Sequence, residues 1–248
     1  MLFGACKHSS GTILAGARQK LSNRSRSQIC GRKTGIFIME ENRKKRNDLL
    51  AEKIIKGLQS RNMSGFYVQT RQEALDKALE LIPEGSVVAH GGSKSMEEIG
   101  LLDALRSGNY QYVDRSGSSE NKKKAELAAY DADFFLGSTN AITEDGILVN
   151  IDGNSNRVSA YAYGPKHVLL IVGMNKVTAD VDMAVKRARN EAAVINAQRF
   201  GLSTPCTSTG SCMNCKSPDT ICCQFLVTRY SRHKDRIFVI LVDEALGF

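Results

Sequence analysis

Short apolar segments alternate with segments of helical periodicity along most of the chain, and this alternation limits the fold more than any other feature. The clearest apolar segment is HVLLIVG at 167–173, in which nearly every residue is hydrophobic. Such a run is typical of a strand covered on both faces of a sheet. The alternation predicts an α/β fold with a layered, mainly parallel sheet.

The remaining elements follow from periodicity and from turn residues. Further strands are expected at 66–70, 86–90, 110–113, 133–137 and 147–151. Helices are expected at 40–60, 71–82, within 91–108 after a loop, at 120–130 and at 179–197. Residues 157–164 are expected to pair with 147–151 as a hairpin. Two last strands, 225–228 and 236–242, are expected to be joined by a polar turn, so some antiparallel additions are predicted.

Length and charge exclude several classes of protein. The 248 residues are 42% hydrophobic and 24% charged, which is typical of a globular protein. No run of 18 apolar residues occurs, so no membrane span is expected. Seven of the 34 basic residues lie in residues 1–38, which have no Asp or Glu. The remaining 27 face 26 acidic residues, and this near neutrality argues against a nucleic-acid partner.

Two parts of the chain are expected. Residues 1–38 form an extension outside the fold, and residues 39–248 form one domain that includes a cysteine-rich segment at 204–224. The favoured interpretation of the extension is an upstream start, with Met39 as the natural first residue. An organelle-targeting segment is the alternative, because the extension is rich in Ser and Arg and lacks acids. A secretory signal is disfavoured because a continuous apolar core is missing.

The first candidate site is HGGSKS at 90–95, where a strand leads into two glycines and a hydroxyl-rich helix start. Glycines let backbone N–H groups approach a ligand, and ligands of open α/β sheets bind at the carboxyl ends of strands. An anion is therefore expected at Gly91, Gly92, Ser93 and Ser95. The alternative is a tight turn without a ligand, with Ser95 and Glu98 forming a capping box. The glycine spacing matches neither a P-loop nor a dinucleotide fingerprint.

The second candidate site is the polar segment 137–160. Asn140 and Asn150 are expected in the floor of a pocket, with Glu144 at a bend that faces the glycine loop. A carboxylate there can serve as base or nucleophile. Two turns that flank one strand are the alternative. Lys166, which follows Gly164-Pro165, is a further candidate for facing the anion.

The third candidate site is a cluster of cysteines, since five of the seven lie between residues 206 and 223. Cys212 and Cys215 form a CxxC pair, and Cys206 and Cys222 can complete a four-thiolate shell. Such a shell suits Zn²⁺ or an iron–sulfur cluster. Reactive or redox-active thiols and a structural loop are alternatives, and disulfides are a weaker one.

Four stretches together resemble the LUD-domain family of lactate-utilisation proteins: IPEGSVVAHGGSKSMEEIG, STNAITEDGILVNIDGNSNRVSA, YGPKHVLLIVGMNKV and PCTSTGSCMNCKSPDTICC. The resemblance covers roughly residues 42–248. It implies a layered α/β fold of the NagB/RpiA/CoA-transferase type. It also implies a cytoplasmic role in the oxidation of lactate, beside iron–sulfur and oxidoreductase partners.

Two departures from the family pattern matter. The ferredoxin-type cysteine runs of the long iron–sulfur members are missing, so electron transfer by this chain alone is in doubt. Cys223 stands where short members tend to have Asn, which leaves open whether Cys222 or Cys223 binds a metal. In addition, TEDGIL at 143–148 is similar to the S-E-N-G stretch of CoA transferases, which would make Glu144 the nucleophile, although Asp145 replaces the Asn.

Three functional hypotheses result, and whether the protein is an enzyme stays open. The first is a LUD-domain protein of organic-acid utilisation that binds a small anionic metabolite at the glycine-rich loop, with a metal or iron–sulfur site. The second is a CoA-transferase-like enzyme of acyl transfer that uses Glu144. The third is a non-catalytic module with a structural zinc.

Overall fold

A computed structural model describes residues 40–248 of the chain. The chain divides into two units, Met1–Arg46 and Asn47–Phe248, and the first is described only from residue 40, where it is helical. The expectations for residues 1–38 lie outside the described residues. Everything that follows concerns the second unit, which begins with a helix over residues 47–60, called here the leading helix.

The second unit is built on a six-stranded sheet in which every pair of neighbours is parallel. The strand order is β1-β10-β7-β4-β2-β3. The strands are β1 (Ser64–Val68), β10 (Ile237–Val242), β7 (His167–Gly173), β4 (Phe134–Gly137), β2 (Val87–His90) and β3 (Gln111–Tyr112). The prediction of a layered, mainly parallel α/β fold is confirmed.

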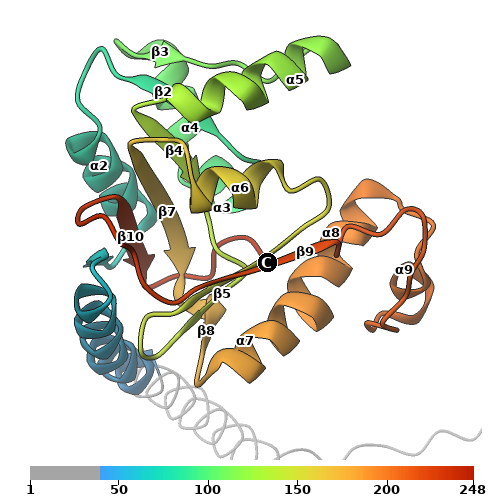
Figure 1. The fold of residues 1–248 in the computed structure, drawn as a ribbon. Helices are drawn as coiled ribbons and strands as arrows, with labels where there is room; N and C mark the ends of the chain where they lie inside the picture. The colour runs from blue at the N-terminus through green and yellow to red at the C-terminus, as the bar shows by residue number, and fades with distance from the viewer. Residues whose placement is uncertain (1–39) are drawn as a thin grey trace, which may run out of the picture. The chain divides into compact units, whose positions relative to one another are not determined.

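Both faces of this sheet are buried, as the apolar sequence of β7 predicts. Leu169 and Ile171 point to a core shared with α2 (Arg71–Leu81), α3 (Lys94–Glu98) and α4 (Leu101–Ser107). Leu170 and Val172 point to the opposite core, shared with the leading helix and α6 (Asn156–Ala162). The helix α5 (Ser119–Ala128) runs into a short 3₁₀ turn, η1 (Ala129–Asp131), on this second side. Figure 1 shows these layers around β4 and β7.

A second, four-stranded sheet lies beside the first, with the order β8-β5-β6-β9. Its strands are β8 (Val177–Thr178), β5 (Ala141–Thr143), β6 (Leu148–Asp152) and β9 (Gln224–Thr228). Antiparallel pairing occurs here, where β6 pairs with both β5 and β9, although these are not the pairs expected from sequence. A short 3₁₀ turn, η2 (Met174–Lys176), leads from β7 into β8.

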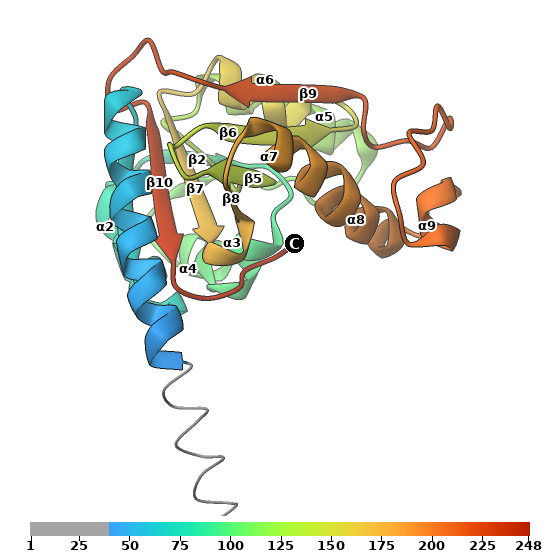
Figure 2. The same ribbon diagram turned by 90° about the horizontal axis from the view of Figure 1, so that it is seen from below.

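A long helical segment packs on the second sheet through Ala184 and Ala188. It consists of α7 (Val181–Arg187), the π-helical turn η3 (Ala188–Ala192) and α8 (Ala193–Phe200). Gly201 then ends α8 in the left-handed conformation, and α9 (Pro205–Thr209) opens the cysteine segment. Figure 2 shows α8 and α9 on the right, with the chain returning from there into β9.

Three local predictions are wrong. Within the predicted strand 157–164, residues 157–162 belong to the helix α6, in which Val158 and Tyr161 are buried at helical spacing while Ala162 is exposed. Ser95 does not cap a helix, because α3 begins one residue earlier and the Ser95 hydroxyl bonds to Lys176. The last two strands are no hairpin, since β9 and β10 belong to different sheets.

Within the described residues, no helix is both long and apolar enough to cross a membrane.

Candidate functional site

The carboxyl ends of β2, β4 and β7 meet around a cavity of about 240 Å³, called here the central cavity. Gly92 and Ser93 follow β2, Ser138 and Asn140 follow β4, and Lys176 follows β7. Neighbouring parallel strands end at the same edge of a sheet, so side chains far apart in the sequence converge there. The end of β6, α6 and α8 complete the wall.

Lys176 is the most unusual side chain of the central cavity. It is 3% exposed, and its Nζ donates to Ser138 Oγ at 2.9 Å and to Ser95 Oγ at 3.0 Å. None of the ion pairs within residues 40–248 involves Lys176. Burial, followed by the charges of Arg187 and Arg157, lowers the pKa of Lys176 from 10.5 to about 7.

Two partly exposed arginines stand beside this lysine. Arg157 lines the cavity, pairs with Asp152 at 3.4 Å and donates from Nη2 to Asn140 Oδ1 at 3.3 Å. Arg187 donates to the carbonyl of Asn140 and pairs with Glu191 at 2.9 Å. The side chains of these arginines are thus partly neutralised and held in place, whereas that of Lys176 is held by hydroxyls alone.

The loop that carries Ser138 is fixed by a close approach of the backbone to Tyr161. The Tyr161 hydroxyl donates to the Ser138 carbonyl at 2.8 Å and accepts from the Ser138 amide at 3.2 Å. A Cβ atom at Gly137 would lie 1.9 Å from that hydroxyl, so only glycine fits at this position. The Tyr161 hydroxyl thus fixes the backbone of Ser138, while the Ser138 hydroxyl accepts from Lys176.

The structure gathers most of the predicted ligand-binding residues at one place. Gly92, Ser93 and Asn140 line the central cavity. Ser95 lies directly behind it against Lys176, as the contact above shows. The backbone at Gly91 packs on Arg157, since a Cβ there would lie 2.9 Å from Arg157 Cγ.

Asn150 stands one layer further back, on β6. Its Nδ2 donates to Thr139 Oγ1 at 3.2 Å, while its Oδ1 is buried without a hydrogen-bond partner. The hydroxyl of Ser93 is likewise buried and without a partner among the described residues. Of these two side chains only Ser93 lines the cavity, so its hydroxyl is a polar atom of the wall that is left unsatisfied, which is costly unless a ligand or water compensates.

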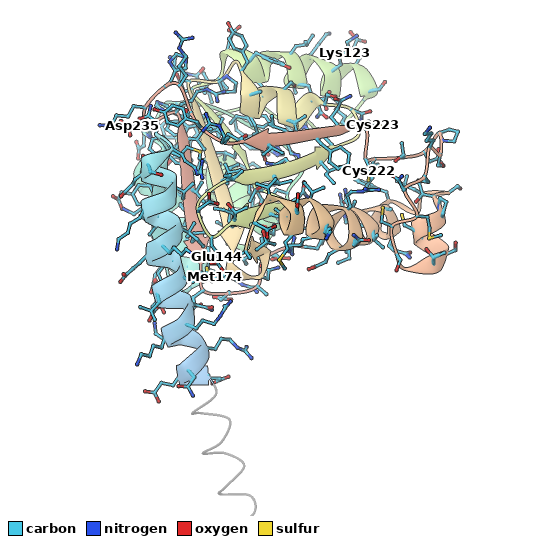
Figure 3. The ribbon with its side chains drawn as sticks, turned by 60° about the horizontal axis from the view of Figure 1, so that its bottom comes forward. Lys123, Glu144, Met174, Cys222, Cys223 and Asp235 are labelled. Carbon is cyan, nitrogen blue, oxygen red and sulfur yellow. The ribbon has the colours of Figure 1, made fainter. Side chains whose placement is uncertain are left out.

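Two predicted residues lie outside the central cavity. Asn140 precedes β5 at the cavity, whereas Glu144 follows the carboxyl end of β5 and pairs with Lys53 of the leading helix at 2.6 Å. Lys166 precedes β7 and pairs with Asp133 at 2.7 Å, at the amino edge of the sheet. Figure 3 shows Glu144 beside the leading helix and well apart from Cys222 and Cys223.

The predicted metal ligands line a second cavity of about 210 Å³, called here the cysteine cavity. All four face it: Cys206, Cys212, Cys215 and Cys222. Burial, together with the other three thiols, raises the pKa of Cys222 to about 11. Arg189 Nη2 donates to Cys212 Sγ at 3.4 Å. Cys223 is exposed and does not line the cavity, so of the two adjacent thiols Cys222 is the one that faces the others.

The donor chemistry of the cysteine cavity suits a soft metal, since four thiols can give four thiolates. All five cysteines of the segment are free of disulfides. Within residues 40–248, however, no three His, Cys, Asp or Glu side chains stand in an arrangement that could hold a metal ion. The four cysteines thus share a cavity and influence the Cys222 pKa, but their sulfurs would have to draw closer to act as ligands.

A mainly parallel α/β sheet with a cationic cavity at its carboxyl edge defines the general class of the protein. The family itself is shown by sequence: the model of the LUD domain matches residues 51–242, and the chain belongs to this family. Membership supports a role related to lactate utilisation. No curated protein matches the chain significantly in sequence.

Solved structures give weaker likenesses. A DUF162 family protein from Deinococcus radiodurans is 13% identical, with a TM-score of 0.45, over 79% of this chain and 96% of that one. Ribose 5-phosphate isomerase from Plasmodium falciparum is 15% identical, with a TM-score of 0.30, over 44% of this chain and 52% of the other. At these TM-scores neither carries an argument about function.

Sequence reasoning missed Lys176, Arg157 and Ser138. One signal was available for Lys176, because it follows the most apolar strand at the edge where ligands of α/β sheets bind. No comparable signal marks Arg157, whose segment was interpreted as a strand. Ser138 is one small polar residue in a segment that contains many.

Proposed function

We propose that the protein binds a small carboxylate, of the 2-hydroxy or 2-oxo acid type, in the central cavity as part of lactate or related organic-acid utilisation. Membership of the LUD domain family supports the organic-acid context. The observation that carries the proposal is Lys176, a buried amine that lines the cavity and lacks a carboxylate partner within the described residues.

A buried ammonium without a counter-ion is costly, and a bound anion removes that cost. Six basic side chains line the cavity against the acidic Glu97 and Asp152: Lys94, Arg115, Lys122, Arg157, Lys176 and Arg199. A volume of about 240 Å³ suits a molecule of a few heavy atoms rather than a nucleotide. The size and the charge of the cavity thus favour the same kind of ligand.

Calorimetric titration of the full chain with L-lactate, D-lactate and pyruvate tests the proposal. Saturable binding is expected for at least one of these acids. Replacing Lys176 with Met removes the positive charge at similar length, and the affinity should fall by about tenfold or more, as expected when a charge-assisted contact is lost.

Lys166→Met is the matched control, because Lys166 lies at the opposite edge of the sheet and pairs with Asp133. Glu144→Gln is a second control outside the cavity. Both should bind as the wild type does. Absence of binding for all three acids, or equal losses in Lys176→Met and Lys166→Met, would contradict the proposal.

We further propose that the cysteine cavity holds a metal ion or an iron–sulfur cluster through Cys206, Cys212, Cys215 and Cys222. The four thiols in one cavity support this assignment. When bound, a metal would hold the segment between α9 and β9 in one conformation and, as a cluster, would supply one-electron chemistry. A role beside iron–sulfur and oxidoreductase partners stays a prediction of the family resemblance.

A further inference from the structure

The environment of Lys176 differs from that of a lysine that only neutralises an anion. Its Nζ lies between two hydroxyls, Ser138 Oγ at 2.9 Å and Ser95 Oγ at 3.0 Å. The backbone of Gly247, which also lines the central cavity, lies so close that a Cβ there would be 3.3 Å from Nζ. The amine is therefore enclosed by Ser95, Ser138 and Gly247 and lines the cavity.

The charges that face Lys176 come from several elements. Arg187 of α7 and Arg157 of α6 act against its protonation, and Glu98 of α3 and Glu191 of η3 act weakly in its favour. Together with burial they leave a large share of the amine neutral near pH 7. A neutral lysine amine beside other cations is an activated nucleophile.

A partner group for a carboxylate stands nearby. Arg157 uses Nε and Nη2 to bind Asp152, Asn140 and the Ile151 carbonyl. The guanidinium also lies over the Tyr161 ring, with Cζ 5.7 Å from the ring centroid, and the side chain lines the cavity. One cavity thus combines a cation for a carboxylate with a nucleophilic amine for a neighbouring carbonyl carbon.

We propose that Lys176 forms an imine with the keto group of a small 2-oxo acid bound in the central cavity, an assignment that rests on the carboxylate binding proposed above. Nζ attacks the keto carbon, and the carbonyl oxygen takes up a proton to give a carbinolamine. The hydroxyl then leaves as water with the second amine proton, so that amine and ketone give imine and water. No oxidant or reductant is needed.

The two serine hydroxyls are suited to this sequence of proton transfers. Each lies within hydrogen-bond distance of Nζ, and each hydroxyl can both donate and accept. We assign Ser95 and Ser138 as positioning residues that hold Nζ and pass its protons to the departing oxygen.

Reductive trapping of the full chain tests the proposal. The protein is incubated with pyruvate and borohydride near pH 7.5, and labelled peptides are mapped by mass spectrometry. At this pH the neutral fraction of the Lys176 amine is on the order of several hundredfold larger than that of an ordinary lysine. One reduced pyruvate on Lys176 is expected, with at least ~10-fold more label there than on Lys166.

Three comparisons make the outcome decisive. L-lactate has no keto group, so it should leave no adduct and should compete with trapping by pyruvate. Lys176→Arg has no primary amine and should lose the adduct, whereas Lys166→Arg, outside the cavity, should keep it on Lys176. Ser138→Ala should slow trapping and change its pH profile, a readout that a purely structural role of the serine would not move.

The two proposals fail in distinguishable ways. Calorimetric binding of pyruvate to wild-type protein without an adduct at Lys176 would overturn the imine and leave carboxylate binding intact. Label spread evenly over exposed lysines would also overturn the imine. No binding of any acid would overturn the function on which the imine rests.

Discussion

At the scale of single residues, the chemistry concentrates on Lys176. Its amine is buried in a wall that holds it with hydroxyls instead of carboxylates. Such a position lowers stability, because the unfolded chain keeps an ordinary lysine that is readily protonated. A buried residue with a strongly shifted pKa at the carboxyl edge of the sheet is typical of functional sites.

The cost of Lys176 predicts a pH-dependent gain of stability in Lys176→Met. The folded pKa of about 7 lies below the ordinary 10.5, so between these values the unfolded state binds more protons and wild-type stability rises with pH. The variant lacks this penalty and should be more stable, most of all below pH 7. Its advantage should shrink by about 2–3 kcal/mol from pH 6 to pH 9, as measured by denaturant unfolding.

Lys166→Met is again the control, because Lys166 is exposed and its replacement removes no buried charge. Its stability relative to wild type should stay nearly constant over the same pH range. A Lys176→Met advantage that does not change with pH would show that the lysine is not desolvated as described.

At the scale of elements, two short segments shape the walls of the cavities. The π-helical turn η3 places Ala188 and Ala192 against the central cavity, where their small side chains leave room. π-helical turns often occur at functional sites. The segment between α8 and β9 helps to enclose the cysteine cavity, and Gln198 Nε2 of α8 donates to the Thr207 carbonyl of this segment.

Removal of one cysteine tests the metal proposal at this scale. Cys212→Ser should abolish stoichiometric binding of zinc or iron, measured by metal analysis of protein purified without oxygen. Cys223→Ser is the matched control and should keep the metal, because Cys223 is exposed and outside the cavity. Metal retained in Cys212→Ser, or lost equally in both variants, would contradict the ligand set.

At the scale of the whole second unit, the two cavities are neighbours. Ala193 of α8 and Ile221 line both, so one wall separates the carboxylate site from the four thiols. Cys223 continues this link, since its backbone amide donates to the Asp152 carbonyl at 3.0 Å. A change in the cysteine segment can thus reach Asp152 and, through it, Arg157.

The sequence predicted the parts of the molecule that depend on local patterns. The apolar run 167–173 predicted the central strand β7. The cysteines were predicted to share one site because they are close together in the sequence. Other features depend on tertiary contacts. Residues 157–164 fit either a strand or a helix until the burial of Tyr161 decides between them. The burial of Lys176 follows from the tertiary fold and cannot be read from its place after β7.

The most direct test of the central claim is the pKa of Lys176 in the free protein and with saturating L-lactate, measured by NMR of labelled lysine side chains. The free protein should show a value of about 7. A bound carboxylate favours the ammonium form of Lys176. The pKa of Lys176 should therefore rise by about one unit or more, as expected for an opposite charge close by. A pKa near 10.5 in the free protein, or one unchanged by bound lactate, would contradict the account.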